Sequence, residues 1–467
     1  MVFSSLVFLY LFLPINLIFY FICKNDTYKN LVLLCFSLLF YAWGQPFYVL
    51  LLVISTLINY YLAILIDKYK ETSKSKLFLF LAVFFDLGLL AYFKYYNFFV
   101  ENVNLVFSTN ITLSKVGLPI GISFFTFKII TYVVDVYKKE VEVQKSFNKL
   151  LLYVSLYHQI MSGPIVKYKD MENVLVKREI NVSEFSYGLN RFMAGLFKKV
   201  MIANSVGAAS AVFLESNLNE ISILGAWLGI IMYTLQIYFD FSGYSDMAIG
   251  LGKMFGFTYK ENFNYPYIAK SAQDFWRRWH ISLSQFFRDY VYIPLGGNRK
   301  YYIRNIFIVW MLTGLWHGAS YNFIIWGLYY GIFLLLEKYL LSKILNKLPR
   351  FISHIYLILV VIIGWTFFYF LDISKAFEFI KILFGFAGNP LYDVKFEVEF
   401  YNNVILLVVG ILASTPIFKI LFEKLDKNLN NNKVANVLHG FVNVAILIIC
   451  TIMLVGQTFT PFLYFKF

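Results

Sequence analysis

One histidine stands alone in a long stretch of sequence without charged residues. No Lys, Arg, Asp or Glu occurs in the 32 residues from Asn305 to Leu336, and His317 is the one imidazole among them. Burial in an apolar environment disfavours the charged form of an imidazole, so we expect a neutral base that can accept a proton near neutral pH. A histidine that is only hydrogen-bonded between helices is the structural alternative, and the spacing alone leaves both open.

The stretch Asn305–Leu336 exceeds the length of about 20 apolar residues that one membrane-spanning helix needs. Its segment Trp316–Asn322 contains a glycine and several polar side chains, which favour an interruption of the helix there. We therefore predict a break at this point. The break would place His317 near the end of a short helix, well below the membrane surface.

Aromatic and cationic side chains share the segment Phe275–Tyr290. At about 100° per residue, the aromatic side chains occupy one arc and Arg277 and Arg278 the other, which predicts one amphipathic helix with His280 at the edge of the apolar arc. The helix could lie in the membrane interface. It could instead fold into the protein with its arginines turned towards an anionic ligand, because guanidinium groups suit phosphate oxygens.

Two carboxylates, Asp240 and Asp246, continue an apolar run and come close to membrane depth. A carboxylate at that depth needs a partner, and Lys253 and the arginines of the amphipathic helix are the candidates. Structural pairing is one interpretation of these residues. A proton pathway is the functional alternative, because chains of carboxylates and imidazoles carry protons in transporters.

The elements that must position these residues are membrane helices. The chain is 60% hydrophobic and 15% charged, whereas a soluble domain has roughly 25% charged residues. Runs that reach or approach the length of a membrane span include Val2–Cys23, Phe47–Ile66, Leu77–Phe93, Ile223–Phe239, Ile355–Leu371 and Val404–Leu421. We predict an all-α polytopic integral membrane protein with about ten to twelve transmembrane or re-entrant helices.

We expect a single membrane domain over residues 1–467, because no hydrophilic stretch is long enough to form a separate soluble domain. In the middle region, about 117–331, the apolar segments carry Gly, Pro, Asp, Arg and His. Such interruptions are tolerated at membrane depth only where protein buries them or water reaches them. The catalytic or binding site is therefore predicted in this region.

The formal net charge of +14 comes from Lys and Arg that are spread over many short loops. This pattern is typical of a protein in a lipid bilayer and not of a nucleic-acid-binding surface. Because positive loops tend to stay in the cytoplasm, the loop around Lys343, Lys347 and Arg350 would face that side. The five histidines and three cysteines lack metal-ligand spacing, and no phosphate-cradling glycine loop occurs. We expect neither a metal nor a tightly bound cofactor.

Several short motifs, in order along nearly the whole chain, resemble those of the membrane-bound O-acyltransferases. They are Met1–Ser5, Pro119–Phe127 with Asp135, Ser162–Pro164, Phe239–Asp246, Phe275–Ser284, Pro294–Asn298 and Leu315–Gly318. The bacterial branch that O-acetylates alginate is the most similar branch. The resemblance implies a ring of tilted helices around a thinned centre, with a tunnel that links the two membrane faces.

The resemblance also implies which residues act. The invariant histidine of the family's Leu-Trp-His-Gly motif corresponds to His317, and the second important polar residue corresponds to His280. We expect His317 to be the base that removes the proton of the attacking hydroxyl. His280 would orient the donor or acceptor, or stabilise the developing oxyanion. Further candidates for substrate or tunnel contacts are Trp276, Arg277, Arg278, Trp316, Asn322, Asp240 and Asp246.

For function, the resemblance implies an O-acetyltransferase in the cytoplasmic (inner) membrane of a bacterium. It would take an acetyl group from a cytoplasmic donor, for which acetyl-CoA is one candidate. An extracytoplasmic acetyltransferase partner would complete the transfer to an alginate-, cellulose- or peptidoglycan-like polysaccharide. Two alternatives stay open: D-alanyl transfer to teichoic acid within the same family, and a proton-coupled transporter with Asp240, Asp246 and His317 as a relay.

Overall fold

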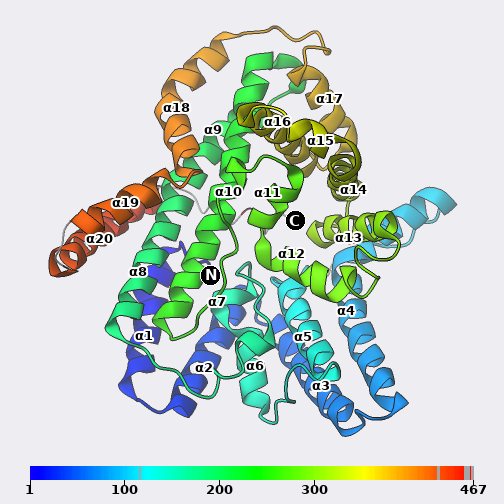
Figure 1. Ribbon diagram of the computed structural model, residues 1–467, viewed down its shortest axis with the longest axis vertical. Helices are drawn as coiled ribbons and strands as arrows, with labels where there is room; N and C mark the ends of the chain where they lie inside the picture. The colour runs from blue at the N-terminus through cyan, green and yellow to red at the C-terminus, as the bar shows by residue number, and fades with distance from the viewer. Residues whose placement is uncertain (115–116, 429–431, 457–462, 464–467) are drawn as a thin grey trace. The chain divides into compact units, whose positions relative to one another are not determined.

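The computed structural model describes residues 1–114, 117–428, 432–456 and 463. Within these residues the regular structure is helical, and they contain no β-strand (Figure 1). The fold comprises two compact units. The first is Met1–Phe192 with Ser245–Lys260, and the second is Met193–Tyr244 with the described residues from Glu261 onwards. The predicted all-α class is confirmed, and the region 117–331 contributes residues to both units.

Eight helices in the described part of the chain are long and apolar enough to cross a membrane. They are Tyr48–Lys68, Ser73–Phe107, Val182–Leu214, Ile223–Met254, Tyr321–Leu345, Arg350–Tyr369, Val394–Ala413 and Val437–Gly456. The apolar helix Phe8–Ile22 is shorter. The chain is therefore a multi-pass membrane protein, as predicted. The predicted total of ten to twelve helices counted transmembrane and re-entrant helices together. The ring of tilted helices and the tunnel that links the membrane faces stay predictions.

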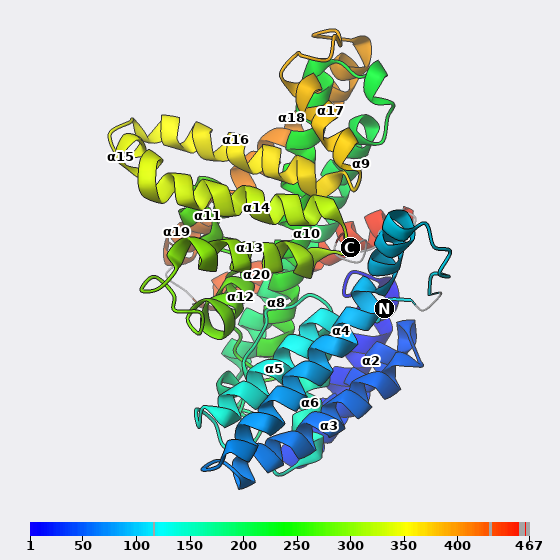
Figure 2. The ribbon, with the colours of Figure 1, turned by 90° about the vertical axis from the view of Figure 1, so that its right-hand side faces the viewer.

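The first unit is built from the N-terminal helices. They are α1 (Leu13–Ile22), α2 (Asp26–Gly44), α3 (Tyr48–Lys68), α4 (Ser73–Phe107), α5 (Ile122–Tyr137), α6 (Phe147–Ser155), α7 (Tyr157–Ile160) and the first part of α8 (Val182–Phe197). Asn25 caps α2, because its side-chain oxygen accepts hydrogen bonds from the amides of Thr27 and Tyr28. Figure 2 shows α3, α4 and α5 side by side.

The second unit contains the C-terminal helices and most of α10 (Ile223–Met254), whose last residues belong to the first unit. Its other helices are α9 (Asn204–Leu214), α11 (Ala272–Arg278), α12 (Ile281–Phe287), α13 (Tyr302–His317), α14 (Tyr321–Leu336), α15 (Ser342–Leu345), α16 (Arg350–Tyr369), α17 (Ile373–Leu383), α18 (Val394–Ala413), α19 (Ile417–Asn428) and α20 (Asn432–Gly456). Single π-helical turns follow α8, α12 and α14.

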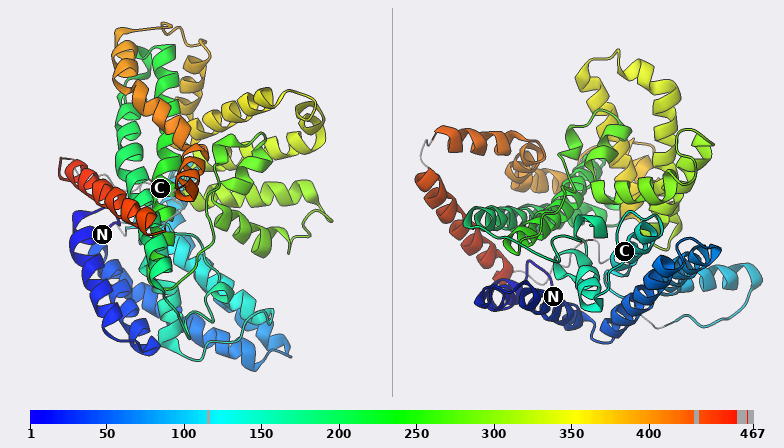
Figure 3. Two further views of the ribbon diagram at one scale, coloured as in Figure 1. Left: turned by 60° about the vertical axis from the view of Figure 1, so that its left-hand side comes forward. Right: turned by 60° about the horizontal axis from the view of Figure 1, so that its bottom comes forward.

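α13 and α14 form a closely packed hairpin. α13 ends at His317, before α14 begins, so the predicted interruption is confirmed. Two glycines allow the close approach. A Cβ atom on Gly314 would lie 2.1 Å from the carbonyl oxygen of Phe323, and one on Gly327 would lie 2.2 Å from that of Trp310. α16 packs against α14, and Figures 2 and 3 show the three helices side by side.

The predicted single amphipathic helix over Phe275–Tyr290 is wrong. α11 ends at Arg278, α12 begins at Ile281, and His280 between them has a left-handed backbone with a φ of 43°. The backbone carbonyl of Asn262 accepts a hydrogen bond from the Ile281 amide at 2.9 Å. A segment before α11 thus binds the first amide of α12 and holds the chain in the broken conformation. Helical spacing of the aromatic residues could not reveal this partner.

Replacing Gly314 by alanine is expected to lower the stability of the folded protein. The methyl group would collide with a backbone carbonyl of α14, and overpacking of this kind costs about 1–3 kcal/mol. The measurement is the midpoint of thermal unfolding of the purified protein in detergent. Gly88→Ala in α4 is the matched control, because a Cβ atom there would meet nothing within 4 Å. Equal midpoints for the two variants would contradict the close packing of α13 on α14.

Candidate active site

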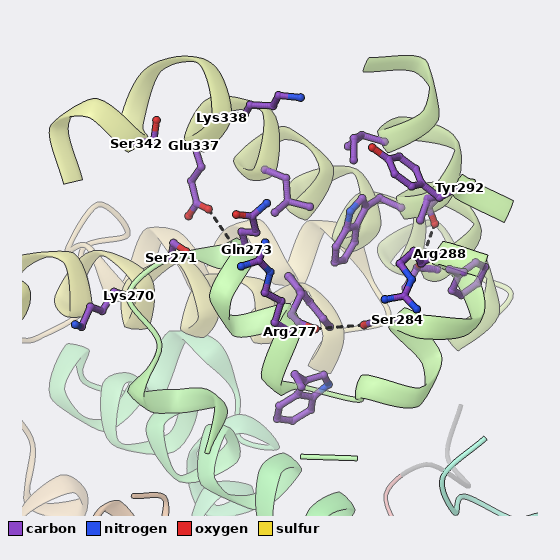
Figure 4. Close-up of a pocket in the computed structure, with 18 of the residues that line it drawn as sticks. Lys270, Ser271, Gln273, Arg277, Ser284, Arg288, Tyr292, Glu337, Lys338 and Ser342 are labelled. Atoms are coloured by element: carbon purple, nitrogen blue, oxygen red, sulfur yellow. Dashed lines mark hydrogen bonds between the residues drawn. The ribbon is translucent and has the colours of Figure 1, made fainter. Parts of the chain in front are cut away.

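The second unit contains a cavity of about 1030 Å³. Its walls come from α11, α12 and α13 and from the chain between the end of α14 and the start of α16, and Figure 4 shows a close-up of the lining side chains. His280 and His317 both line the cavity, together with Trp276 and Arg277. The structure therefore brings both predicted histidines and two of the predicted contact residues to one cavity.

His317 is the last residue of α13 and is 6% exposed. Its imidazole lies among aromatic rings: the ring centroids of Trp316, Trp326 and Phe368 are 4.8, 4.9 and 5.0 Å away. These rings come from α13, α14 and α16, so three helices fix the position of one imidazole. An aromatic wall of this kind keeps water away from the side that it covers.

His280 occupies the bend between α11 and α12 and is 1% exposed. Its ring packs on Phe241 of α10 at 4.7 Å and lies 5.7 Å from the ring of Trp316. Trp316 therefore contacts the rings of both His280 and His317. Burial lowers the pKa of the His280 imidazole to about 3, so this ring is neutral at physiological pH.

Trp276 and Arg277 reach the cavity from α11, whereas Arg278 does not line it. The Trp276 ring packs on Trp310 and Tyr330, with centroids 4.8 Å away in both cases. Arg278 instead forms an ion pair with Asp274 one turn earlier, at 2.9 Å. The two arginines, which are adjacent in sequence, thus have different surroundings.

A buried carboxylate that was not predicted holds the start of α11. Glu337, which follows α14, accepts hydrogen bonds from the amides of Ala272 at 2.6 Å and Gln273 at 3.0 Å, and Figure 4 shows the contact at Gln273. These amides have no partner within their own helix, and a negative charge at a helix start is favourable. Tyr356 of α16 also donates to Glu337, at 3.2 Å. A signal existed in the sequence, because Glu337 is the first charged residue after the stretch Asn305–Leu336.

The cavity is electropositive. Among the residues that line it are five cationic side chains, Lys270, Arg277, Arg288, Lys338 and Arg350. Glu337 is the acidic side chain among these lining residues, and its oxygens are engaged by backbone amides and a tyrosine. A cleft lined by charges of one sign attracts ligands of the opposite sign. The cavity therefore suits a ligand that carries negative charge.

The two carboxylates lie outside the cavity lining and have partners other than the predicted ones. Asp240 forms a buried ion pair with Lys199 at 2.5 Å. Asp246 belongs to the first unit and is paired with Arg191 at 2.6 Å. Lys253 pairs with Glu184 instead. The segments that pack on α10 supply these partners, and the sequence alone does not show which segments do so.

Asn322, the remaining predicted contact residue, ties two helices together. Its side-chain amide donates a hydrogen bond to the carbonyl oxygen of Phe367 at 3.0 Å. This contact joins the start of α14 to the end of α16, close to the point where α13 ends at His317. Asn322 is fully buried and does not line the cavity.

The fold agrees with a comparison against protein families. A family model described as MBOAT, membrane-bound O-acyltransferase family, matches residues 35–375. The chain belongs to the membrane-bound O-acyltransferase family and is an O-acyltransferase. The resemblance found in the motifs is thereby confirmed.

Relatives that are similar to this chain include two O-acetylating proteins and one D-alanyltransferase. The chain is 41% identical over 408 residues to the probable alginate O-acetylase of Pseudomonas aeruginosa, covering 85% of this chain and 77% of that protein. It is 34% identical over 459 residues to the peptidoglycan O-acetyltransferase of Helicobacter pylori, covering 90% and 87%. The similarity to the teichoic acid D-alanyltransferase of Bacillus subtilis, 34% over 231 residues, covers 46% and 57%.

Replacement of Glu337 by alanine is expected to slow acyl transfer. Loss of the carboxylate leaves two amides at the start of α11 without a partner, which costs about 0.5–2 kcal/mol and loosens the helix that carries Trp276 and Arg277. Glu337→Gln keeps one oxygen acceptor and should lose less. The measurement is the transfer rate of each purified variant beside its unfolding midpoint. Wild-type rates for the alanine variant would refute this role.

Proposed function

We propose that the protein moves an acetyl group from a cytoplasmic donor across the membrane for O-acetylation of an extracytoplasmic polysaccharide. The observation that carries the proposal is the single cavity lined by both His280 and His317. Two relatives that match most of the chain support the acetyl cargo, because their names give O-acetylation of alginate and of peptidoglycan. Both of these polymers carry hydroxyl groups as acceptors.

Acyl transfer from a thioester to a hydroxyl forms a C–O bond and breaks a C–S bond. The hydroxyl proton must leave as the oxygen attacks, and the departing sulfur can take it up. His317 acts as the base that moves this proton, a role that typically contributes about 10²–10⁴-fold to the rate. The aromatic rings around it keep the imidazole in place. His280, which lines the same cavity, orients the reacting molecules.

The donor is a substrate and not a bound cofactor, and acetyl-CoA is the candidate whose charge fits. The five cationic side chains along the cavity suit the phosphates of such a molecule. One of them, Arg350, belongs to the loop that the positive-inside tendency assigns to the cytoplasm. The donor therefore enters from the cytoplasm.

The acceptor side involves a second protein. An extracytoplasmic acetyltransferase partner receives the acetyl group and completes the transfer to the polysaccharide, and the enzyme itself resides in a bacterial cytoplasmic membrane. D-alanyl transfer to teichoic acid is the second candidate. The D-alanyltransferase relative matches less than half of the chain, whereas the two O-acetylating relatives match 85% and 90% of it, which favours acetyl.

His317→Ala is expected to reduce O-acetylation by about 10²-fold or more, because the base is lost while the fold is kept. The measurement is the amount of ester-linked acetate and of ester-linked D-alanine in the cell envelope of strains that produce equal amounts of each variant. His439→Ala is the control, since this partly exposed residue of α20 is not among those that line the cavity.

Wild-type acetylation by the His317→Ala protein would contradict the catalytic assignment. Loss of D-alanine esters with acetate unchanged would replace the acetyl cargo by D-alanine. If neither ester is lost, both acetyl transfer and D-alanyl transfer are wrong as proposed functions.

A further inference from the structure

Asn262 lies in the second unit, between α10 and α11, and its side chain is fully buried against the His280 bend. Its side-chain oxygen Oδ1 lies 3.1 Å from Nδ1 of His280. The same oxygen accepts hydrogen bonds from Ser282, at 3.2 Å from the backbone amide and at 2.8 Å from the hydroxyl. One amide side chain therefore contacts both the imidazole and the start of the helix that follows it.

These contacts determine which ring nitrogen of His280 carries the proton. A backbone N–H can only donate, so the Asn262 atom that faces the Ser282 amide must be the oxygen and not the NH₂ group. An amide oxygen can only accept a hydrogen bond. The partner nitrogen, Nδ1 of His280, must therefore be the protonated one. A neutral imidazole has a single N–H, so the other nitrogen, Nε2, carries a lone pair.

Nε2 of His280 is buried and has no hydrogen-bond partner among the described residues. His280 lines the cavity, so a molecule that fills the cavity can supply the missing donor. The ring is neutral because burial lowers its pKa. Asn262, Ser282, Phe241 of α10 and Trp316 of α13 face this ring, and none of them carries a charge. The cavity itself also holds the guanidinium of Arg277 and the imidazole of His317.

We propose that Asn262 is a positioning residue for acyl transfer, which holds His280 with Nδ1 protonated and so presents Nε2 as a hydrogen-bond acceptor to the molecule in the cavity. The inference rests on the proposed function of this cavity. His280 then receives a hydrogen bond from an O–H, N–H or S–H group of donor or acceptor. It has no proton on Nε2 to give to a developing oxyanion, so of its two expected roles the orienting one remains.

The protonation of His280 can be measured without any turnover. In protein labelled with ¹³C and ¹⁵N at histidine, the nitrogen and ring-carbon chemical shifts distinguish the two neutral forms, and the signal of His280 is the one that disappears in His280→Gln. The expected result is a neutral ring with the proton on Nδ1 over the physiological pH range. A ring protonated on Nε2, or a charged ring, would overturn the proposal.

A pH profile tests whether this arrangement governs the reaction. In Asn262→Asp the carboxylate still accepts from Nδ1 but stabilises the imidazolium, which raises the pKa of His280. Activity should therefore fall as the pH drops through the raised pKa and recover as the pH rises above it. The acid limb of kcat should move upwards by about one to three pH units. An unchanged acid limb in a folded, active Asn262→Asp protein would overturn the proposal.

Asn264→Asp is the matched control. It adds the same charge two positions away in the same loop, where the backbone carbonyl and not the side chain contacts Arg278. The acid limb of kcat in Asn264→Asp should coincide with that of the wild type. An equal shift in Asn264→Asp and Asn262→Asp would overturn the proposal, because it would show that any added negative charge in this loop has the same effect. Full activity of His317→Ala beside an Nδ1-protonated His280 would contradict the proposed function while leaving the geometry of His280 intact.

Discussion

A break between two buried helices leaves backbone carbonyl and amide groups without partners in their own helix, so such a break persists only where protein covers it. α13 ends at His317 under this constraint. The cover comes from α14 and α16: Gly314 and Gly327 let the backbones of α13 and α14 touch, and Asn322 ties the start of α14 to the end of α16. The position of His317, its aromatic surroundings and one wall of the cavity all follow from this packing.

The cavity has an aromatic part and a cationic part, and acyl transfer from a negatively charged donor needs both. Around His317 the walls are aromatic and keep water away from the side of the imidazole that they cover. Around Arg277 and Arg350 the lining is cationic, which suits a donor with phosphate groups. His280 lies between α11 and α12, and its orientation depends on a hydrogen bond to Asn262 in the loop before α11. Helices position His317, and the buried side chain of Asn262 in a loop positions His280.

Much of this arrangement could be predicted from the sequence, because the bilayer imposes a length and a composition on each helix. The apolar runs predicted the membrane helices, and the glycine and polar residues after Trp316 predicted the break. The bend at His280 could not be predicted, because it depends on hydrogen bonds to Asn262, a residue distant in sequence. The partners of Asp240 and Asp246 were missed for the same reason, since helix periodicity says nothing about which segment packs alongside.

We propose that acyl transfer takes place in the cavity that His280 and His317 line. The most direct test is an experimental structure of the protein with a non-hydrolysable analogue of acetyl-CoA. We expect the acetyl group to lie next to the two imidazoles and the phosphates to lie beside the cationic side chains that line the cavity. An acetyl group bound outside this cavity, in a protein that retains the fold, would contradict the account.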